Sequence, residues 1–232
     1  MISARELMRV HVEALFTHDA AGDLVRLNEP DGAPAPRFFL GRTVDGGVRR
    51  FRHDIDHELR RELEDASKDD ALTERALDSP ASPAPYEAIL TRYAPVRRTW
   101  VGPAFCFPQE LPMPSATILV TEENTHLLRP LLAPWLPDVR SSQPMFALAV
   151  DGQAVTVCAS VRITSMAHEA GVETCPSYRG RGYAARVVAA WARAVRDMGR
   201  VPLYSTSWQN EASRAVARKL ALICFANDLH IT

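Results

Sequence analysis

Apolar residues along the C-terminal half of the chain change their spacing several times, and each change predicts an element. Short runs rich in β-branched residues predict strands, and apolar residues three and four apart predict helices. The strands are expected at residues 116–121, 146–150, 154–163, 169–175, 201–205 and 222–231. The helices are expected at residues 124–136, from residue 185 to near Gly199, and at residues 210–220. Asp151-Gly152 between two β-branched runs predicts a hairpin turn.

The N-terminal part predicts a small β-rich unit that ends in a helix. Two hairpins are expected, one joining residues 10–16 to 24–28 and one joining 37–42 to 48–52, because turn-forming residues separate these runs. A charged helix over residues 56–67 follows. We therefore expect a first domain at residues 1–77.

Proline is concentrated in the middle of the chain. Residues 78–85 have the composition of a linker, and further prolines with aromatic residues continue to residue 112. This segment, residues 78–112, either lines a substrate cleft or covers the interface between the parts that it joins. A second domain is expected at residues 113–232.

Composition narrows the class of partner. The chain has 232 residues, of which 47% are hydrophobic and 24% charged, and its formal net charge is −1. A general nucleic-acid binder normally carries a basic stripe, so we expect a small-molecule partner and no nucleic acid. Apolar runs fall short of the ~18 residues that a membrane span needs, which predicts no membrane insertion and a cytoplasmic location.

Metal-binding and acid-binding patterns are weak. The four cysteines are scattered and are expected to be reduced and mostly buried, and no metal site is expected. His53 and His57 have helical metal-ligand spacing, but no third ligand accompanies them. An arginine cluster around residues 49–52, with further arginines at 60 and 61, either binds an acidic ligand or forms a solvated surface of mixed charge. Nearby acidic residues favour the solvated surface.

The sequence Pro-Ser-Tyr-Arg-Gly-Arg-Gly-Tyr-Ala-Ala at residues 176–185 is a strand-to-helix turn that can bind an anion. Gly180 and Gly182 remove the Cβ atoms that would keep a ligand from the backbone. The first amides of the following helix have no partner within the helix, and the helix dipole is positive at this end. Arg179 and Arg181 add charge, so a phosphate or pyrophosphate is the expected ligand.

Three phosphate-binding patterns compete for this turn. A P-loop would require a Gly-Lys-Ser or Gly-Lys-Thr ending, which is missing. Gly180, Gly182 and Ala185 fit a dinucleotide fingerprint, but the intervening residues 176–178 keep the first glycine from lying tight against the strand, and the next strand does not end in an acid. The third pattern is Arg or Gln, two residues, Gly, one residue, and then Gly or Ala. Arg179, Gly182 and Ala184 satisfy it. It resembles the acyl-CoA pyrophosphate loop of the GNAT superfamily of N-acetyltransferases.

The resemblance extends from about residue 168 to the end of the chain, because strand, loop, long helix, strand, helix and final strand follow in the order of that superfamily. It implies an α+β fold with a mixed, mainly antiparallel sheet flanked by helices, here preceded by the small β-rich domain. It also implies acetyl-CoA as cosubstrate and an amine as acceptor. The oligomeric state, monomer or homodimer, is left open.

The resemblance implies which residues contact coenzyme A. Backbone groups of Val172, Glu173 and Thr174 are expected to meet the pantetheine arm and the oxyanion. The pyrophosphate is expected at Arg179, Gly180, Arg181, Gly182, Tyr183 and Ala184. Asn210 and Ser213 are implied as contacts to the coenzyme arm or the substrate, although Asn210 is first of all expected to be the N-cap of the helix that follows.

Acyl transfer to an amine needs a base and an acid. Glu169 and Glu173 are the candidate bases, four residues apart on one expected strand and so on one face of it. His168 is a third option. Where many family members carry a proton-donating tyrosine, this chain has Phe225, so Tyr204 or Tyr183 is the candidate donor, unless the thiolate leaves into water.

Two classes of function follow. The first is an N-acyltransferase that uses acetyl-CoA on a small amine, a protein N-terminus or a lysine. The second is an acyl-CoA-binding regulatory module with weak or lost catalysis, which Phe225 favours. The carboxylates on the expected strand before the loop favour the enzyme. A third reading is a nicotinamide- or flavin-binding protein, which rests on Gly180, Gly182 and Ala185.

Overall fold

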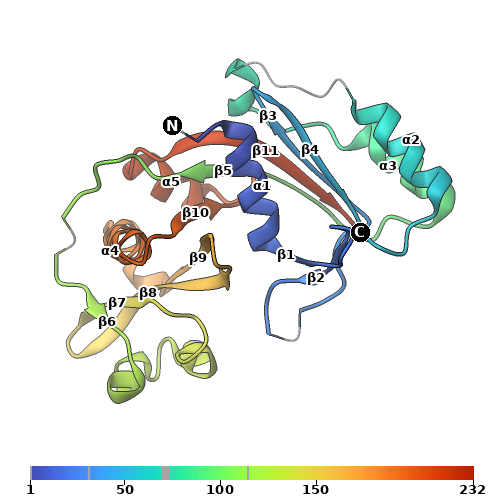
Figure 1. The fold of residues 1–232 in the computed structure, drawn as a ribbon. Helices are drawn as coiled ribbons and strands as arrows, with labels where there is room; N and C mark the ends of the chain where they lie inside the picture. The colour runs from blue at the N-terminus through green and yellow to red at the C-terminus, as the bar shows by residue number, and fades with distance from the viewer. Residues whose placement is uncertain (1, 31, 69–73, 114) are drawn as a thin grey trace. The chain divides into compact units, whose positions relative to one another are not determined.

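The computed structural model describes residues 2–30, 32–68, 74–113 and 115–232. These residues form two compact units, each with its own strands and helices (Figure 1). Unit 1 contains residues 1–105, 205–211 and 224–232, and unit 2 contains residues 106–204 and 212–223. The domain boundaries expected at residues 78 and 113 concern which segments fold independently, and they stay a prediction.

Unit 1 is built on the four strands β4-β3-β11-β5, in that order, and a separate antiparallel pair β1-β2. Its strands are β1 Phe16–His18, β2 Leu24–Leu27, β3 Phe38–Thr43, β4 Gly46–Phe51, β5 Thr99–Cys106 and β11 Ile223–Ile231. Its helices are α1 Ala4–Leu15, α2 His57–Ser67, η1 Glu74–Asp78 and α3 Ala84–Tyr93. The hairpin β3-β4 and the helix α2 agree with the sequence predictions.

Helix α1 corrects the first predicted hairpin. Residues 10–15 are helical, and the antiparallel partner of β2 is limited to β1. Ser3 caps the helix, its side chain accepting from the Glu6 backbone N–H at 3.2 Å. A Ser followed three residues later by Glu is a capping-box pattern, and it outweighs the β-branched residues near position 10.

Alternation along β3 gives the unit 1 sheet two apolar faces. Phe38 and Leu40 join a core cluster with residues of α2 and α3. The intervening residues face α1, where a Cβ on Gly41 would come within 2.3 Å of Met8 Sδ. The sheet is therefore covered on one face by α1 and on the other by α2 and α3 (Figure 1).

The proline-rich middle segment is more regular than its composition suggests. Helix α3 begins directly after Pro83, and β5 runs from Thr99 to Cys106. Proline is compatible with the first turn of a helix because its missing N–H has no acceptor there. Tyr86 and Leu90 of α3 are buried in the unit 1 core.

Unit 2 has the strand order β10-β9-β8-β7-β6, antiparallel except for β9-β10. Its strands are β6 Ile118–Leu119, β7 Met145–Val150, β8 Gln153–Ile163, β9 Ala167–Thr174 and β10 Val201–Ser205. Its helical segments are η2 Glu122–Leu128, η3 Ala133–Asp138, η4 Pro176–Tyr178, α4 Tyr183–Asp197 and α5 Glu211–Lys219. The mixed, mainly antiparallel sheet flanked by helices confirms the predicted fold class.

The prediction of a helix over residues 124–136 is wrong. Two short 3₁₀ segments, η2 and η3, stand in its place. Pro130, Pro134 and Pro137 interrupt this stretch, and proline in a helix interior removes a donor and clashes with the preceding turn. The apolar residues still reach the core, where Leu128 and Leu132 are fully buried.

Helix α4 covers one face of the unit 2 sheet. The side chain of Trp191 on this helix is fully buried, and its indole Nε1–H donates to Ser160 Oγ on β8 at 3.0 Å. Segments η2 and η3 pack into a second cluster with β7 and β8. Among the residues that the structure describes, no helix is both long and apolar enough to cross a membrane.

Candidate functional site

The turn between β9 and α4 leaves backbone donors open. After the short 3₁₀ turn η4, Gly180 and Gly182 adopt positive φ values of 77° and 78°. Gly182 is the N-cap of α4, and no side chain caps the helix there. The left-handed φ at both positions favours glycine. The first amides of α4 therefore remain available to an anion.

Two arginines are fastened to this turn by their own side chains. Arg179 Nε donates to the Thr174 carbonyl at 3.1 Å, and Arg181 Nη2 donates to the Ser177 carbonyl at 3.3 Å. The Arg181 guanidinium also lies 5.2 Å from the centroid of the Tyr178 ring. Each guanidinium keeps further N–H groups for a ligand, so the turn carries two positioned positive charges.

Lys219 adds a third cation that the sequence did not connect with the turn. The last residue of α5, it places Nζ 2.2 Å from the position that a Cβ on Gly182 would occupy. The ammonium thus reaches the N-terminus of α4 across more than thirty residues of sequence. No sequence motif links the two positions, because the approach depends on how α4 and α5 pack.

Strands β9 and β10 separate next to this turn. Their parallel ladder pairs Val201 with Ala167, Pro202 with His168 and Leu203 with Glu169, and there it stops. Strand β9 continues to Thr174, still paired with β8 on its other side. Val172, Glu173 and Thr174 therefore lie on a stretch of β9 whose β10 edge is open, as the resemblance implied for a pantetheine arm.

The two candidate bases sit in different environments. Glu169 is 1% exposed, on the last rung of the β9-β10 ladder. Glu173 is exposed, and its Oε2 accepts from Trp135 Nε1 at 2.5 Å. A carboxylate beside the strand opening and away from bulk water is the better placed of the two for proton transfer, whereas Glu173 holds the Trp135 indole of η3.

Tyr204 lies on β10 just past the last rung of the ladder. Its hydroxyl is 2.6 Å from Ser213 Oγ on α5 and donates to the Ser213 carbonyl at 3.3 Å. Burial raises the pKa of Tyr204 to about 12, although the hydrogen bond with Ser213 opposes the change. The hydroxyl stays protonated at neutral pH, and the structure brings Tyr204 and Ser213 together.

His168 is held as a neutral structural group. It is 1% exposed, and Nδ1 lies 2.8 Å from Ser160 Oγ, which already accepts from Trp191. Ser160 Oγ therefore links the imidazole of β9 to the indole of α4, and either member of the Ser160–His168 pair can be the donor, because a hydroxyl oxygen can accept two hydrogen bonds. Burial, and then the charge of Arg200, lower the pKa of His168.

The other residues named from the sequence lie on α4, before α5 and on β11. Tyr183 and Ala184 open α4 beside Gly182. Asn210 directly precedes α5, at the position expected for an N-cap, and belongs to unit 1. Phe225 is also in unit 1, buried on β11 with its ring edge-on to His11 at 6.2 Å between centroids.

Comparison with known families identifies the segment that carries this site. A family model described as GNAT acetyltransferase matches residues 146–225. Residues 146–225 are thus similar to the GNAT acetyltransferase family. The match includes β8, β9, the turn with its two glycines, α4 and α5, so the family resemblance stated from the sequence is confirmed. No curated protein gave a significant match.

A solved structure of the GNAT family has a similar fold. An acetyltransferase from Colwellia psychrerythraea is 11% identical, with a TM-score of 0.51 over 87% of this chain and 82% of that one. A GNAT-family protein from Novosphingobium aromaticivorans is 22% identical, with a TM-score of 0.49 over 59% of this chain and 65% of that one. This chain thus spans slightly less than two thirds of the latter protein.

Proposed function

We propose that this chain is an N-acyltransferase that moves an acetyl or short acyl group from acyl-CoA to an amine by direct attack. The observation that supports this most is the combination of an open β9 edge with three cations and an uncapped helix at its end. A thioester arm laid along β9 would end with its phosphates at the turn. The open strand edge, which suits the thioester arm, is thus followed by the cationic turn, which suits the phosphates.

The phosphates are proposed to bind at the turn. Backbone N–H groups from Gly180 to Ala184 donate to the pyrophosphate, and the α4 dipole favours its charge. Arg179, Arg181 and Lys219 supply the countercharge, at positions supported by their contacts around Gly182. The β9 backbone at Val172 to Thr174 pairs with the pantetheine amides and donates to the oxyanion.

The chemical step follows from the residues beside the strand opening. The amine nitrogen attacks the thioester carbonyl, an N–C bond forms, and the C–S bond breaks. Glu169 accepts the amine proton, directly or through a water, because it is the buried carboxylate at the last rung of the ladder. Tyr204 is the proposed donor to the departing thiolate, and it is protonated at neutral pH because its pKa is about 12.

A second function, acyl-CoA binding without efficient transfer, is favoured by one observation. The Tyr204 hydroxyl is engaged with Ser213, and Phe225 cannot donate a proton where many family members have a tyrosine. In this reading the protein binds the thioester and reports it to a partner.

Thiol release distinguishes the two functions. The purified protein is mixed with acetyl-CoA and a panel of primary amines, including polyamines, amino sugars and peptides with free N-termini, and free CoA thiol is followed with a chromogenic disulfide. If the protein is an acyltransferase, we expect catalytic release of the thiol with at least one amine. The Glu169→Gln variant should lose this release. Saturable acetyl-CoA binding without release for any amine, while the acetyl-CoA affinity of Glu169→Gln stays unchanged, would favour the binding module.

A further inference from the structure

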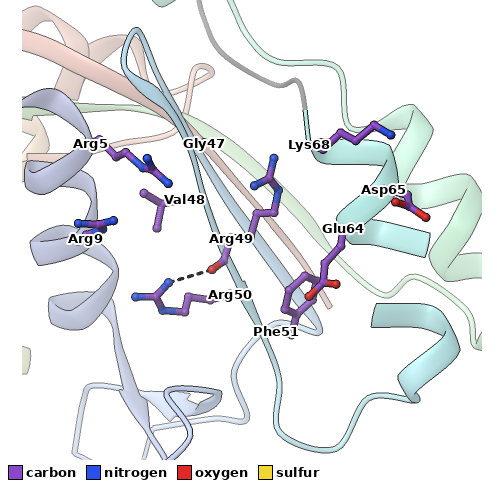
Figure 2. Close-up of a pocket in the computed structure, with 10 residues that line it drawn as sticks. All are labelled: Arg5, Arg9, Gly47, Val48, Arg49, Arg50, Phe51, Glu64, Asp65 and Lys68. Carbon is purple, nitrogen blue, oxygen red and sulfur yellow. Dashed lines mark hydrogen bonds between the residues drawn. The ribbon is translucent and has the colours of Figure 1, made fainter. Parts of the chain in front are cut away.

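Unit 1 has a charged pocket that the acyl-transfer site does not use. Its volume is ≈520 Å³, within the range of small-ligand and peptide sites, and it lies over β4, the edge strand of the unit 1 sheet (Figure 2). Residues from α1, β4 and α2 line it. They are Arg5, Arg9, Gly47, Val48, Arg49, Arg50, Phe51, Glu64, Asp65 and Lys68.

The pocket is net positive, since five of its residues are cationic and two are acidic. Arg5 and Lys68 are exposed and make no ion pair with any residue in the described part of the chain. Within the part of the chain that the structure describes, the ion-pair partner of Arg9 is the exposed Glu6, at 3.1 Å. Such surface pairs contribute little, so these cations are available to a partner of opposite charge.

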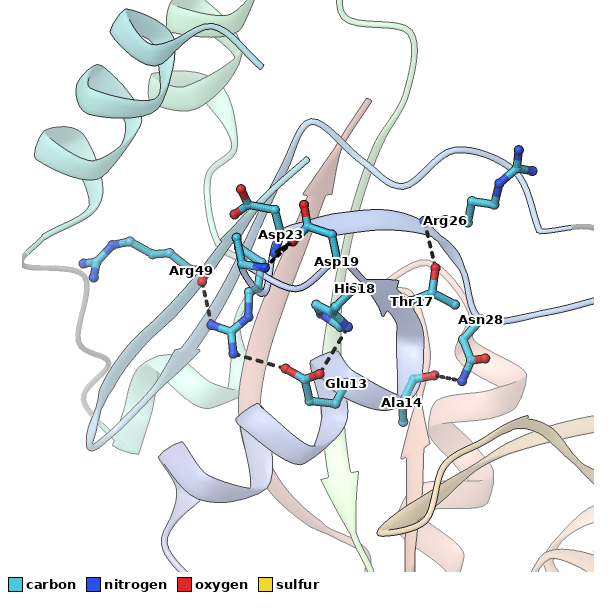
Figure 3. Close-up of polar contacts among 11 residues, drawn as sticks. Glu13, Ala14, Thr17, His18, Asp19, Asp23, Arg26, Asn28 and Arg49 are labelled. Atoms are coloured by element: carbon cyan, nitrogen blue, oxygen red, sulfur yellow. Dashed lines mark hydrogen bonds and ion pairs between the residues drawn. The ribbon is translucent and has the colours of Figure 1, made fainter. Parts of the chain in front are cut away.

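Two arginines of the pocket are fixed in place by the protein. Arg49 Nε donates to Ser67 Oγ at 2.7 Å, and its Nη2 also contacts the Ser67 carbonyl. Arg50 Nη2 donates to Glu13 Oε1 at 3.2 Å in the cluster that Figure 3 shows, where His18 contacts the same carboxylate. Both guanidinium groups keep unused N–H donors. A ligand would therefore not have to order these two side chains.

The cations lie on opposite sides of the strand. In Figure 2, Arg5, Arg9 and Arg50 lie on the α1 side of β4, whereas Arg49 lies on the side of α2. This follows from the alternation of side chains along a strand. A single small anion would meet one group only. An extended chain alongside β4 would present alternate side chains to both groups.

The free edge of β4 supplies the remaining contacts. Strand β4 is hydrogen-bonded to β3 on one side and is the last strand in the order. Arg50 Nη1 already donates to the carbonyl of Arg49 at 2.9 Å, so an added strand would use other backbone groups of β4. Edge strands with open backbone groups accept an added strand, and the added strand gains main-chain hydrogen bonds.

We propose that the edge of β4 binds an acidic, extended peptide segment of a partner protein, which adds to the unit 1 sheet as a further strand. Acidic side chains of the segment meet Arg5, Arg9 and Arg50 on one side and Arg49 and Lys68 on the other. Arg52 and Arg60 lie outside the pocket, where Arg52 pairs with Asp54 and Arg60 with Asp23. This site is independent of the proposed acyl transfer.

The test uses the full-length protein and fluorescence anisotropy. The probe is a labelled peptide that alternates glutamate with valine; a second peptide alternates lysine with valine, and a third repeats the first with alternate backbone amides N-methylated. We expect the acidic peptide to bind, the basic peptide not to bind, and the N-methylated peptide to bind at least tenfold more weakly. The double variant Arg5→Glu/Lys68→Glu is expected to lose about tenfold in affinity. The matched control Arg61→Glu/Arg98→Glu, with the same charge change at exposed positions of unit 1 outside the pocket, is expected to keep it.

Three results would overturn the proposal. Equal binding of the N-methylated peptide would exclude strand addition. Equal loss in both double variants, with each variant shown to be folded by circular dichroism, would mean that net charge alone attracts the peptide. Tighter binding of a single-stranded oligonucleotide of the same charge would identify a polyanion surface and not a peptide site.

Discussion

Lys219 Nζ stands 2.2 Å from the point where Gly182 would carry a Cβ. The ammonium at the end of α5 and the bare backbone at the start of α4 thus occupy one site, although each belongs to a different helix. Absence of a side chain at Gly182 lets a cation approach the helix N-terminus. We propose that acyl-CoA binding by this protein depends on that juxtaposition.

Replacing Gly182 by alanine is expected to weaken acetyl-CoA binding at least tenfold. The new Cβ would displace the Lys219 ammonium and enter the path of the phosphates. The left-handed φ of 78° would also cost about 1–2 kcal/mol of unfolding free energy. Calorimetry and urea unfolding measure the two effects.

Gly199→Ala is the matched control for backbone strain. Gly199 has a φ of 73°, and a Cβ there would meet no atom within 4 Å. The two variants should lose similar stability, and only the Gly182 variant should lose affinity. Equal affinity loss in both would mean that strain, and not the site, is responsible.

Lys219→Ala should weaken acetyl-CoA binding by about tenfold, which corresponds to ~1.4 kcal/mol. Lys219→Arg should retain most of the affinity, because the charge is kept. The loss should shrink as salt is raised, since an exposed ammonium is screened. The same comparison is made with dephospho-CoA, which lacks the 3′-phosphate. If wild type and Lys219→Ala bind dephospho-CoA equally well, then Lys219 contacts the 3′-phosphate and not the pyrophosphate at Gly182.

Glu169→Gln should reduce kcat about 100-fold with little change in acetyl-CoA affinity, as expected for a lost general base. Glu173→Gln should change kcat by less than about threefold, because Glu173 is exposed and bound to Trp135. Steady-state kinetics of both variants decide between the two. A larger loss in the Glu173 variant would reverse the assignment.

Tyr204→Phe should lower kcat by about 10- to 100-fold if the hydroxyl protonates the leaving thiolate. Because burial raises the pKa of Tyr204 to about 12, the donor remains protonated up to about pH 10, and no alkaline fall in rate should come from it. A pH profile of wild type and variant measures this. An alkaline limb near pH 8 that disappears in the variant would contradict the raised pKa.

Acid stability should depend on Asp228 in unit 1. Burial alone would raise the pKa of this carboxyl, but hydrogen bonds from His11 at 3.1 Å and His230 at 3.2 Å outweigh it and lower the pKa to about 2. The folded protein binds the proton less tightly than the unfolded chain, so the stabilisation is present above about pH 4 and is lost toward pH 2. It amounts to about 2 kcal/mol.

Urea unfolding between pH 7 and pH 2 measures this contribution. Asp228→Asn should be less stable at pH 7 and should lose less stability on acidification than wild type. Glu123→Gln, at an exposed position, should follow the wild-type curve. An Asp228 variant with the full wild-type acid dependence would place the titrating group elsewhere.

Local signals predicted the elements whose chemistry is local. Asp151 and Gly152 have positive φ values of 50° and 78°, as the hairpin turn requires, and the glycines of the phosphate turn are left-handed as expected. The start of α1 was also readable, from Ser3 and Glu6, but nearby β-branched residues favoured a strand. Composition alone misled around α3, where Pro83 precedes a helix.

Contacts between distant segments could not be predicted. Lys219 meets Gly182 only because α5 packs beside α4, and Trp135 meets Glu173 only because η3 covers β9. The sequence does place both glutamates on one strand, but their burial differs because the fold encloses Glu169 and leaves Glu173 in solvent. Spacing along a strand determines on which face of the sheet a side chain lies, but not how deeply that side chain is buried.

The most direct test is a calorimetric titration of the purified protein with acetyl-CoA, run beside a matched titration with NAD and repeated with Gly182→Glu. We predict saturable binding of acetyl-CoA, no binding of NAD, and no acetyl-CoA binding by the folded variant, whose added carboxylate would occupy the anion site. Unchanged acetyl-CoA affinity in the variant, or tight NAD binding in place of acetyl-CoA, would contradict the assignment of this turn to coenzyme A.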